Sequence, residues 1–548
     1  MPVAPRCLTP VAPRCLAPPP RRRVGDAFRG YRSRGARFDP AGPASGPVTT
    51  QGPPSSRPSS AMSAAADAPA EPSSVPSYHD DVDVTKYDEM LAEKVEALRA
   101  KFAPLLRNDA DDADDAFVPL EVFPSPPKHF RSRCRFQVVA TNTKTEARDA
   151  ADARRPVLSY HLREGGAVTG AITEFPMALE SINRTMPRLL DAVADDASGE
   201  LADGLEAVNF LAARGSGGMH VTLVYSRPID ADGKWFAAAS RARERLLRES
   251  VMETAETSET GRTTASEPER GEPENATAFN LLGRSKGVSV LVGDANHVVE
   301  RLRLRDGRLL AYHQPEGAFS NPNAFVAEHT VNWLRDATAE TARPALRALR
   351  AERRRSSEVP GNAASGDEDL DALPSLLELY CGNGNHTVAL ASSFASVAAV
   401  ELSAALCDAA RANLARNGVR NARVFRAPSE AVARRALRRR RAGGANETSQ
   451  KTSFDDDAAD DCVSSLDVDA FDCVLVDPPR AGLDPDTLAL VKKFDVVLYI
   501  SCDPNSLFAN ATTEGGLAES HALRRFAVFD HFPYTRHIEV GAAWVRKA

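Results

Sequence analysis

The last part of the chain, residues 373–548, alternates short apolar runs with helical segments, and this alternation restricts the possible folds most strongly. We expect strands at residues 376–380, 397–402, 422–427, 471–477, 496–501, 526–529 and 537–545. We expect helices at residues 387–394, 404–417 and 485–494. Strands that are apolar throughout are typical of parallel sheets, because helices cover both faces of such sheets. The sequence therefore predicts an α/β domain with a mostly parallel, doubly wound, Rossmann-like sheet, which binds its ligand at the carboxyl ends of the strands.

A second folded block precedes this domain, and 548 residues are enough for two or more domains. Residues 86–102 place apolar side chains at helical spacing and predict a helix. Short strand-like runs follow at residues 133–139, 207–211, 220–225 and 287–292, separated by Gly, Pro and polar turns. We interpret residues 87–335 as an α+β domain with an antiparallel sheet.

The N-terminal residues 1–80 are rich in Pro, Ala, Ser and Arg and contain too few apolar residues to bury a core. The first 60 residues hold ten Arg and two Asp but neither Lys nor Glu. This composition predicts a disordered leader that acts as an organellar transit peptide, for a plastid in preference to a mitochondrion. The alternatives are a leader without an address, a misassigned start codon and a cytoplasmic protein.

Three low-complexity inserts interrupt the folded blocks, at residues 253–278, 337–372 and 434–469. The first half of the second insert, through Arg355, has the composition of a helix. The third contains the cluster Arg438–Arg441 and the acidic run Asp455–Asp457. Runs of this kind are usually solvated, so we expect inserts rather than binding patches.

Composition excludes several classes of protein. No apolar run reaches the ~18 residues that a membrane span requires. Eight cysteines are too few for a disulfide scaffold of this length. The net charge of -7 argues against a nucleic-acid protein held by bulk charge, so an anionic partner would require local patches.

A glycine loop, residues 381–385, follows the first strand of the C-terminal domain. Gly382 and Gly384 permit a tight turn and close approach of a ligand to the backbone. Glu401 ends the next strand, 19 residues after Gly382, where a carboxylate can accept hydrogen bonds from ribose hydroxyls. The chain contains neither the three-glycine dinucleotide pattern at this loop nor a P-loop, which favours S-adenosylmethionine over a phosphorylated nucleotide. A glycine turn that serves packing alone is the alternative.

Two further motifs end strands of the same sheet. Asp477-Pro-Pro-Arg480 forms a rigid turn that leaves Asp477 at the strand's carboxyl end. Arg480 replaces the aromatic residue that stacks on the base in amino-group methyltransferases, which argues against chemistry at an exocyclic nitrogen. Ser501-Cys502-Asp503-Pro504 places Cys502 one strand away, as a nucleophile or as a small core residue.

A third motif lies near the C-terminus, where Glu539 falls at the start of the last strand. A carboxylate there is a candidate general base. An exposed glutamate without a catalytic role is the alternative.

Four long motifs together resemble the uracil-C5 RNA methyltransferases, and within them the branch that forms ribothymidine in the tRNA T-loop. The motifs are Leu377-Glu-Leu-Tyr-Cys-Gly-Asn-Gly-Asn385, Val476-Asp-Pro-Pro-Arg-Ala-Gly-Leu-Asp484, Leu498-Tyr-Ile-Ser-Cys-Asp-Pro504 and Phe529-Asp-His-Phe-Pro-Tyr-Thr-Arg-His-Ile-Glu539. The tRNA branch is also similar at Tyr87-Asp-Glu-Met-Leu-Ala-Glu-Lys94, Glu121-Val-Phe-Pro-Ser-Pro-Pro-Lys-His-Phe-Arg-Ser-Arg133, Leu282-Gly-Arg-Ser-Lys286 and Phe319-Ser-Asn-Pro-Asn323. The similarity covers the chain from about residue 87 to its end, apart from the inserts.

The resemblance implies S-adenosylmethionine as cofactor and a covalent mechanism. Cys502 would add to C6 of uracil, C5 would accept the methyl group, and Glu539 would remove the C5 proton. The residues implied at the cofactor site are Asn321, Tyr380, Gly382, Gly384, Asn385, Glu401 and Asp477. The buried uridine would have to flip out of its stack, with Lys128, Arg131 and Arg133 as candidate phosphate contacts. For these three, a charged strand edge without an RNA contact is the alternative.

Three departures from the family pattern accompany the resemblance. Asn321 stands where the family usually has Gln, Asp503 where it has Asn, and Val540 where Cys is common. Only Cys134 lies between residues 16 and 380, so the four-cysteine iron–sulfur site of the ribosomal-RNA branch cannot form, and we expect neither a metal nor a cluster. We expect a monomer that binds the tRNA T-arm and no membrane. The alternatives are an enzyme acting on ribosomal or other structured RNA and a non-catalytic protein that binds or folds tRNA.

Overall fold

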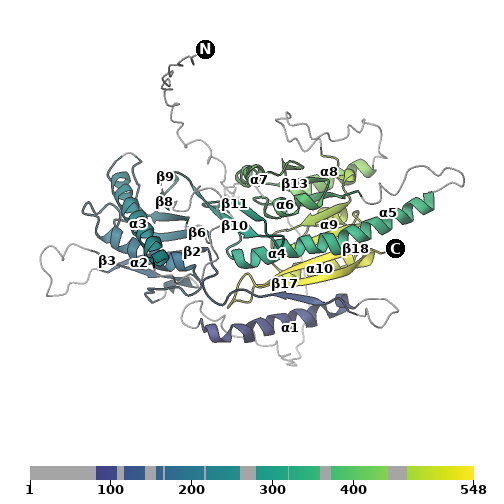
Figure 1. Ribbon diagram of the computed structural model, residues 1–548, viewed down its shortest axis with the longest axis horizontal. Coiled ribbons are helices and arrows are strands. Elements are labelled where there is room, and N and C mark those ends of the chain that lie inside the picture. Colours follow the sequence, from purple (N-terminus) through teal and green to yellow (C-terminus); the bar gives the residue numbers. More distant parts are fainter. Residues whose placement is uncertain are drawn as a thin grey trace, which may run out of the picture. The chain divides into compact units, whose positions relative to one another are not determined.

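The computed structural model describes residues 82–107, 117–141, 156–164, 167–168, 170–214, 218–231, 233–259, 279–318, 320–357, 372–441 and 466–547 (Figure 1). The predicted leader, residues 1–80, lies outside the described residues. So do residues 260–278, 358–371 and 442–465, which hold the larger parts of the first and third predicted inserts and the second half of the second. Within the described residues, no helix is both long and apolar enough to cross a membrane.

An eight-stranded sheet forms the C-terminal domain and confirms the predicted α/β fold. Its strands follow the order β1-β17-β18-β16-β15-β12-β13-β14. They are β1 (Leu120–Phe123), β12 (Ser375–Leu379), β13 (Ser396–Glu401), β14 (Ala422–Arg426), β15 (Cys473–Val476), β16 (Val496–Ser501), β17 (His521–Phe529) and β18 (Glu539–Arg546). All neighbouring pairs are parallel except those of β18, which runs antiparallel to both β16 and β17. The reversed strand β18 matters for the site, because its first residue lies where its neighbour β16 ends.

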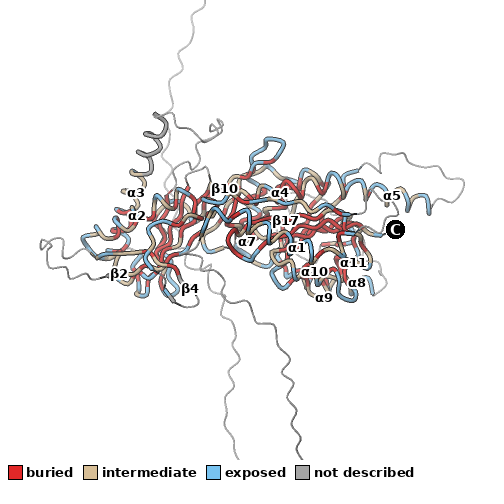
Figure 2. The backbone as a smooth tube through the Cα atoms, turned by 90° about the horizontal axis from the view of Figure 1, so that it is seen from below, coloured by how far each residue is buried: buried red, intermediate tan, exposed pale blue. Residues whose placement is uncertain are grey.

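Helices cover both faces of this sheet, because alternate strand residues are apolar on both sides (Figure 2). One face packs against α1 (Tyr87–Leu106), α8 (Ser429–Arg441), α9 (Pro485–Val491), α10 (Pro504–Thr512) and α11 (Leu517–Ser520). The other packs against α4 (Ala324–Ala337), α5 (Arg343–Ser357), α6 (Asn385–Leu390) and α7 (Ala404–Arg416). Short helical turns are η1 (Val84–Lys86), η4 (Thr338–Ala342), η6 (Ala391–Ser393) and η8 (Val468–Ala470).

The two arginine-rich inserts are partly helical. The expected helix in the second insert is α5. The cluster Arg438–Arg441 forms the last turn of α8, within a stretch that we expected to be an irregular insert. Arg350 and Arg353 pair with Asp472 and Asp495, which precede β15 and β16. These α5 arginines therefore lie at the amino ends of the parallel strands, at the opposite edge from the catalytic motifs.

The front domain contains a six-stranded sheet of order β3-β2-β6-β7-β8-β9. Its strands are β2 (Arg133–Thr141), β3 (Val157–His161), β6 (Leu205–Ala212), β7 (Met219–Tyr225), β8 (Phe279–Ser285) and β9 (Val288–Val292). The predicted antiparallel arrangement holds for every pair except β7 and β8, which are parallel. Two helices, α2 (Glu180–Ala194) and α3 (Lys234–Glu259), pack on one face of the sheet. The short strands β4 (Arg163–Glu164) and β5 (Ala167–Val168) form a separate pair.

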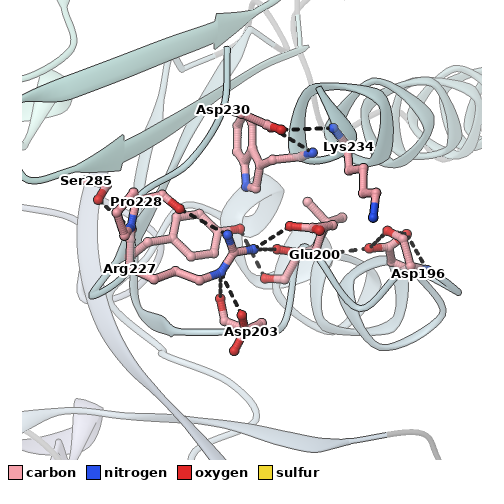
Figure 3. A network of polar contacts seen from close by, with 12 residues as sticks. Asp196, Glu200, Asp203, Arg227, Pro228, Asp230, Lys234 and Ser285 are labelled. Carbon is pink, nitrogen blue, oxygen red and sulfur yellow. Dashed lines mark hydrogen bonds and ion pairs between the residues drawn. The ribbon is translucent and has the colours of Figure 1, made fainter. Parts of the chain in front are cut away.

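Arg227 joins two loops at one end of the front sheet (Figure 3). Its guanidinium donates hydrogen bonds to the carbonyl of Asp203 (2.8 Å), to the Glu200 carboxylate (2.8 Å) and to the carbonyl of Pro228 (3.0 Å). Ser285 at the end of β8 donates to the Arg227 carbonyl. The fork of guanidinium donors thus fixes the loop before β6 to the loop after β7.

Segments of the predicted front domain also build the C-terminal domain. The strand β1 pairs with β17, and α1 and α4 pack on the eight-stranded sheet. A hairpin of β10 (His297–Arg303) and β11 (Leu309–Pro315) packs against α7. The side chains of Asn413 and Asn417 accept hydrogen bonds from the backbone N–H groups of His313 (2.7 Å) and Ala311 (2.9 Å). Segments on both sides of the predicted boundary near residue 335 therefore pack together in the C-terminal domain.

Candidate active site

The candidate site lies at the carboxyl edge of the eight-stranded sheet, where β12, β13, β15 and β16 end. Tyr380, Asp477 and Cys502 each follow directly after one of these strands. Glu539 reaches the same edge from the opposite direction, because β18 is antiparallel. Ser501 pairs with Val540, so Cys502 and Glu539 are the next residues along this register.

The glycine loop holds two glycines with positive φ, at +58° for Gly382 and +78° for Gly384. A Cβ on Gly384 would lie 3.2 Å from the Ala410 Cβ, so this glycine is needed where α6 packs on α7. A Cβ on Gly382 would meet nothing within 4 Å. The packing alternative thus accounts for Gly384, whereas Gly382 leaves open space for a ligand to approach the backbone.

Glu401 lies at the end of β13, beside the loop, as predicted. Its carboxylate accepts hydrogen bonds from the N–H groups of Gly382 (3.1 Å) and Ser403 (2.7 Å). A carboxylate has about four acceptor positions, so two bonds leave capacity for ribose hydroxyls. The next residue, Leu402, is 56% exposed and offers an apolar surface beside this carboxylate. The Leu402 side chain is a feature that our reading of the sequence missed.

The other predicted cofactor residues lie around the loop. Tyr380 has a positive φ of 63°, and burial raises the pKa of its hydroxyl to about 12. Asn385 begins α6, and its carbonyl accepts a hydrogen bond from the Tyr312 hydroxyl (3.0 Å). Asn321 lies on a different segment, and its side-chain oxygen accepts from the N–H of Asn323 (3.0 Å). The structure therefore places Tyr380 and Asn385 at the loop and Asn321 elsewhere at the site.

Cys502 is half-buried, whereas Cys134, Cys381, Cys407 and Cys473 are buried. Burial, together with the negative charges of Glu539 and Asp477, raises the pKa of the Cys502 thiol to about 11, although Arg480 opposes this rise. The turn after β16 is fixed by Ser501, whose hydroxyl donates to the Asp503 carbonyl (2.8 Å). The Cys502 side chain is therefore accessible and electrostatically coupled to both carboxylates.

Glu539 is 8% exposed, so the alternative of a solvent-exposed glutamate is wrong. Burial, together with the negative charge of Asp477, raises the pKa of its carboxyl to about 8, although His386 opposes this rise. Its Oε2 lies 3.4 Å from Nε2 of His531. Burial lowers the pKa of His531 to about 3, so this imidazole is neutral. A carboxyl with a pKa near neutrality is suited to accept and release a proton during turnover.

His531 also connects Asn321 with Glu539. The Asn321 amide nitrogen lies 3.4 Å from His531 Nε2, and the Thr330 hydroxyl lies 3.2 Å from the same atom. The Asn321 side chain thus contacts a histidine that lies beside the Glu539 carboxylate. No role for His531 could be predicted from the sequence, although this residue lies within the motif Phe529–Glu539.

Two more buried residues beneath the site were missed, His386 and Glu378. His386 Nε2 lies 3.4 Å from Asp477 Oδ2. Glu378, in β12, accepts a hydrogen bond from the Thr387 hydroxyl (2.6 Å). A glutamate in an apolar strand and a histidine after a glycine loop give no sequence signal of contact, since the fold alone brings them together.

The candidate RNA contacts differ in their surroundings. Lys128 is exposed. Arg131 donates to the Arg133 carbonyl (3.0 Å), and Arg133 donates to the Ala318 carbonyl (2.6 Å) and the Ser320 hydroxyl (3.0 Å). The Arg133 side chain therefore fixes the segment that carries Asn321, whereas the Arg131 side chain bonds the strand β2 itself. Among the described residues, no group of three or more His, Cys, Asp or Glu side chains is arranged to hold a metal.

The sheet is doubly wound and carries a glycine loop, an acidic residue at the end of β13 and a cysteine–carboxylate pair, all at its carboxyl edge. Together these features define a nucleotide-modifying enzyme of the methyltransferase class. A family model described as tRNA (Uracil-5-)-methyltransferase matches residues 86–259, 265–349 and 366–547. The chain belongs to this family, which confirms the predicted family and enzyme class.

Curated relatives agree with this assignment. The tRNA/tmRNA (uracil-C(5))-methyltransferase of Pseudomonas putida is 33% identical over 465 residues, which cover 85% of this chain and 99% of the relative. The protein of the same name from Vibrio parahaemolyticus is 31% identical over 476 residues, covering 85% and 99%. A tRNA (uracil-54, C5)-methyltransferase from Pyrococcus abyssi, crystallised with S-adenosyl-L-homocysteine, is 18% identical with a TM-score of 0.48, covering 84% of this chain and 83% of that one.

Proposed function

We propose that the protein methylates C5 of a uridine in the tRNA T-loop, with S-adenosylmethionine as methyl donor and Cys502 as a transient nucleophile. One observation carries this proposal: Cys502, Asp477 and Glu539 meet at the carboxyl edge of the sheet, in a chain of the tRNA uracil-C5 methyltransferase family. The geometry favours catalysis over a purely RNA-binding role, because a buried glutamate and a half-buried cysteine have no evident structural use there.

The residues around the glycine loop fit the cofactor. An adenosyl group without phosphates suits three features of this loop: the open space at Gly382, the spare acceptor positions of Glu401 and the exposed side chain of Leu402. Asn385 and Tyr380 border the same loop. S-adenosylmethionine, when bound, supplies an electrophilic methyl group to C5 of the substrate.

Cys502 begins the reaction on the uracil. Its thiolate forms a bond to C6, and the electron pair of the C5–C6 double bond moves toward C5 and the O4 carbonyl, which makes C5 nucleophilic. The raised pKa of the thiol means that its proton must leave before the attack, and Arg480 favours the thiolate. Asp477 follows β15 directly, at the strand end beside Cys502, and holds the uracil.

Glu539 completes the reaction. After C5 has accepted the methyl group, the Glu539 carboxylate takes the C5 proton, the C5–C6 double bond re-forms and the bond from C6 to sulfur breaks. Cys502 leaves as a thiolate. Because Glu539 must be ionised to act as a base, and its pKa is raised to about 8, turnover rises with pH through the neutral range.

The RNA is held by the front domain in this proposal. The strand β2 carries Arg133, Arg135 and Gln137 on one face, opposite the face that packs on α2 and α3. Arg135 and Lys128 are exposed and suit phosphate contacts. The alternative substrates are tmRNA, which the names of the relatives include, and ribosomal RNA.

Trapping on a T-arm minihelix that contains 5-fluorouridine tests this function. Fluorine at C5 blocks the final deprotonation, so a covalent adduct through Cys502 should persist on a denaturing gel. Labelled S-adenosylmethionine should transfer its methyl group to the T-loop uridine of unmodified tRNA. Cys502→Ala should abolish both, with Cys473→Ala as the control for a buried cysteine. Transfer that survives Cys502→Ala would refute the mechanism, and preference for ribosomal fragments would refute the substrate.

Two further proposals concern the cellular form of the enzyme. We propose that residues 1–80 direct it to an organelle, a plastid before a mitochondrion, because their composition is rich in arginine and poor in acids. We also propose that it acts as a monomer, which light scattering of the purified protein tests. A dimer in solution would refute the second proposal.

A further inference from the structure

A single imidazole lies among three carboxyl groups beneath the candidate site. His386, in the first turn of α6, has a side chain that is 9% exposed, and its Nε2 is 3.4 Å from Asp477 Oδ2. The other ring nitrogen is buried and has no hydrogen-bond partner within the described residues. Glu378 and Glu539 also act electrostatically on this imidazole.

The groups that face His386 come from four other elements. Asp477 follows β15, Glu378 is in β12, Glu539 begins β18, and His531 lies between β17 and β18. Three of these four groups are negative when ionised, and His531 is neutral. Burial of several like charges without compensation is unfavourable, so a cation among them stabilises their ionised forms.

The charge of His386 follows from the same arrangement. Burial lowers the pKa of its imidazole, but the hydrogen bond to Asp477 and the charges of Asp477, Glu378 and Glu539 outweigh this and raise the pKa above its ordinary value. In return, His386 lowers the pKa of Glu378 and of Glu539. His386 thus acts electrostatically on Glu539, the proposed base, as well as on Asp477.

We propose that His386 is a positioning residue whose positive charge holds Asp477 in place and favours the ionised form of Glu539, which removes the C5 proton. This inference rests on the proposed function, because it assigns His386 to the step that Glu539 performs. His386 does not touch the reacting atoms; it acts through the two carboxylates. Formation of the Cys502 adduct precedes proton removal and should not require the charge.

Two substitutions separate charge from hydrogen bonding. His386→Gln keeps a hydrogen-bond donor toward Asp477 but removes the charge, and His386→Phe removes both. We expect the rise of kcat with pH to move to higher pH by about one unit in each variant, which lowers turnover near pH 7 about tenfold. Turnover should recover at pH 9 in the Gln variant. The matched control is His521→Gln, a buried histidine that bonds the Phe494 carbonyl (2.8 Å), near the amino ends of the strands.

The adduct assay separates this inference from the proposed function. His386→Gln should still form the 5-fluorouridine adduct at the wild-type rate, while methyl transfer to uridine slows. A Gln variant with the wild-type pH profile would overturn the role of the charge, and so would loss of the adduct together with turnover. If wild-type protein forms no adduct and transfers no methyl group, the proposed function fails first. Thermal unfolding of both His386 variants and of His521→Gln identifies any variant that has lost its fold. If only His386→Phe has lost its fold, the pH profile of His386→Gln tests the inference.

Discussion

Replacing Glu539 by glutamine separates the catalytic use of this carboxyl from its effect on folding. The variant cannot accept the C5 proton, so it should form the 5-fluorouridine adduct but turn over uridine at a rate lower by at least about 100-fold. The same substitution should stabilise the folded protein at neutral and alkaline pH. The reason is that the wild-type chain buries a carboxyl that ionises only with difficulty.

The size of the stabilisation follows from the pKa of Glu539, which burial raises from 4.5 to about 8. Between these two values the folded chain keeps a proton that the unfolded chain has released, so the free energy of unfolding falls as pH rises. Each pKa unit corresponds to about 1.4 kcal/mol. A difference of roughly 3.5 units therefore limits the effect to about 5 kcal/mol. Above pH 8 Glu539 is ionised in both the folded and the unfolded chain, so the free energy of unfolding no longer falls with pH on its account.

Urea unfolding at several pH values tests this reasoning. The stability gap between Glu539→Gln and the wild type should widen by up to about 3 kcal/mol from pH 5.5 to pH 8.5. Glu300→Gln is the matched control, because Glu300 is buried on β10 outside the site and burial raises its pKa to about 7. The stability gap between Glu300→Gln and the wild type should stop widening near pH 7, and this variant should transfer methyl groups at the wild-type rate. A gap for Glu539→Gln that is independent of pH would refute the argument.

Three further predictions follow from other parts of the chain. Gly384→Ala should lose about 1–3 kcal/mol more stability than Gly382→Ala in urea unfolding, because only the new Cβ at 384 meets Ala410 at 3.2 Å; equal losses would contradict this. Lys128→Ala should reduce the salt dependence of T-arm minihelix binding by about one ion. Arg133→Ala should leave the salt dependence unchanged, because the Arg133 guanidinium is held by Ala318 and Ser320. A reduced salt dependence in Arg133→Ala but not in Lys128→Ala would show that Arg133 contacts phosphate. Residues 1–80 fused to a fluorescent protein should carry it into a plastid, and a diffuse cytoplasmic signal would overturn the proposed address.

The strand pattern of the C-terminal domain and the residues that end its strands could be predicted from local sequence patterns. Apolar runs with helices between them permit few arrangements other than a doubly wound sheet. Glycine, proline and charged residues directly after those runs mark the catalytic edge, so Gly382, Glu401, Asp477 and Cys502 could be predicted from their positions. These are local signals, which depend on residues close together in the chain.

Contacts between residues far apart in the chain depend on the pairing of the strands. Pairing with both β16 and β17 fixes β18 as the antiparallel strand, and this pairing delivers Glu539 to Cys502. The strand β1 joins the far side of β17 from about 400 residues away, which no local pattern announces. Burial and mutual electrostatic effects shift the pKa values of His386, Glu378 and His531, because a pKa depends on neighbours in space rather than in sequence.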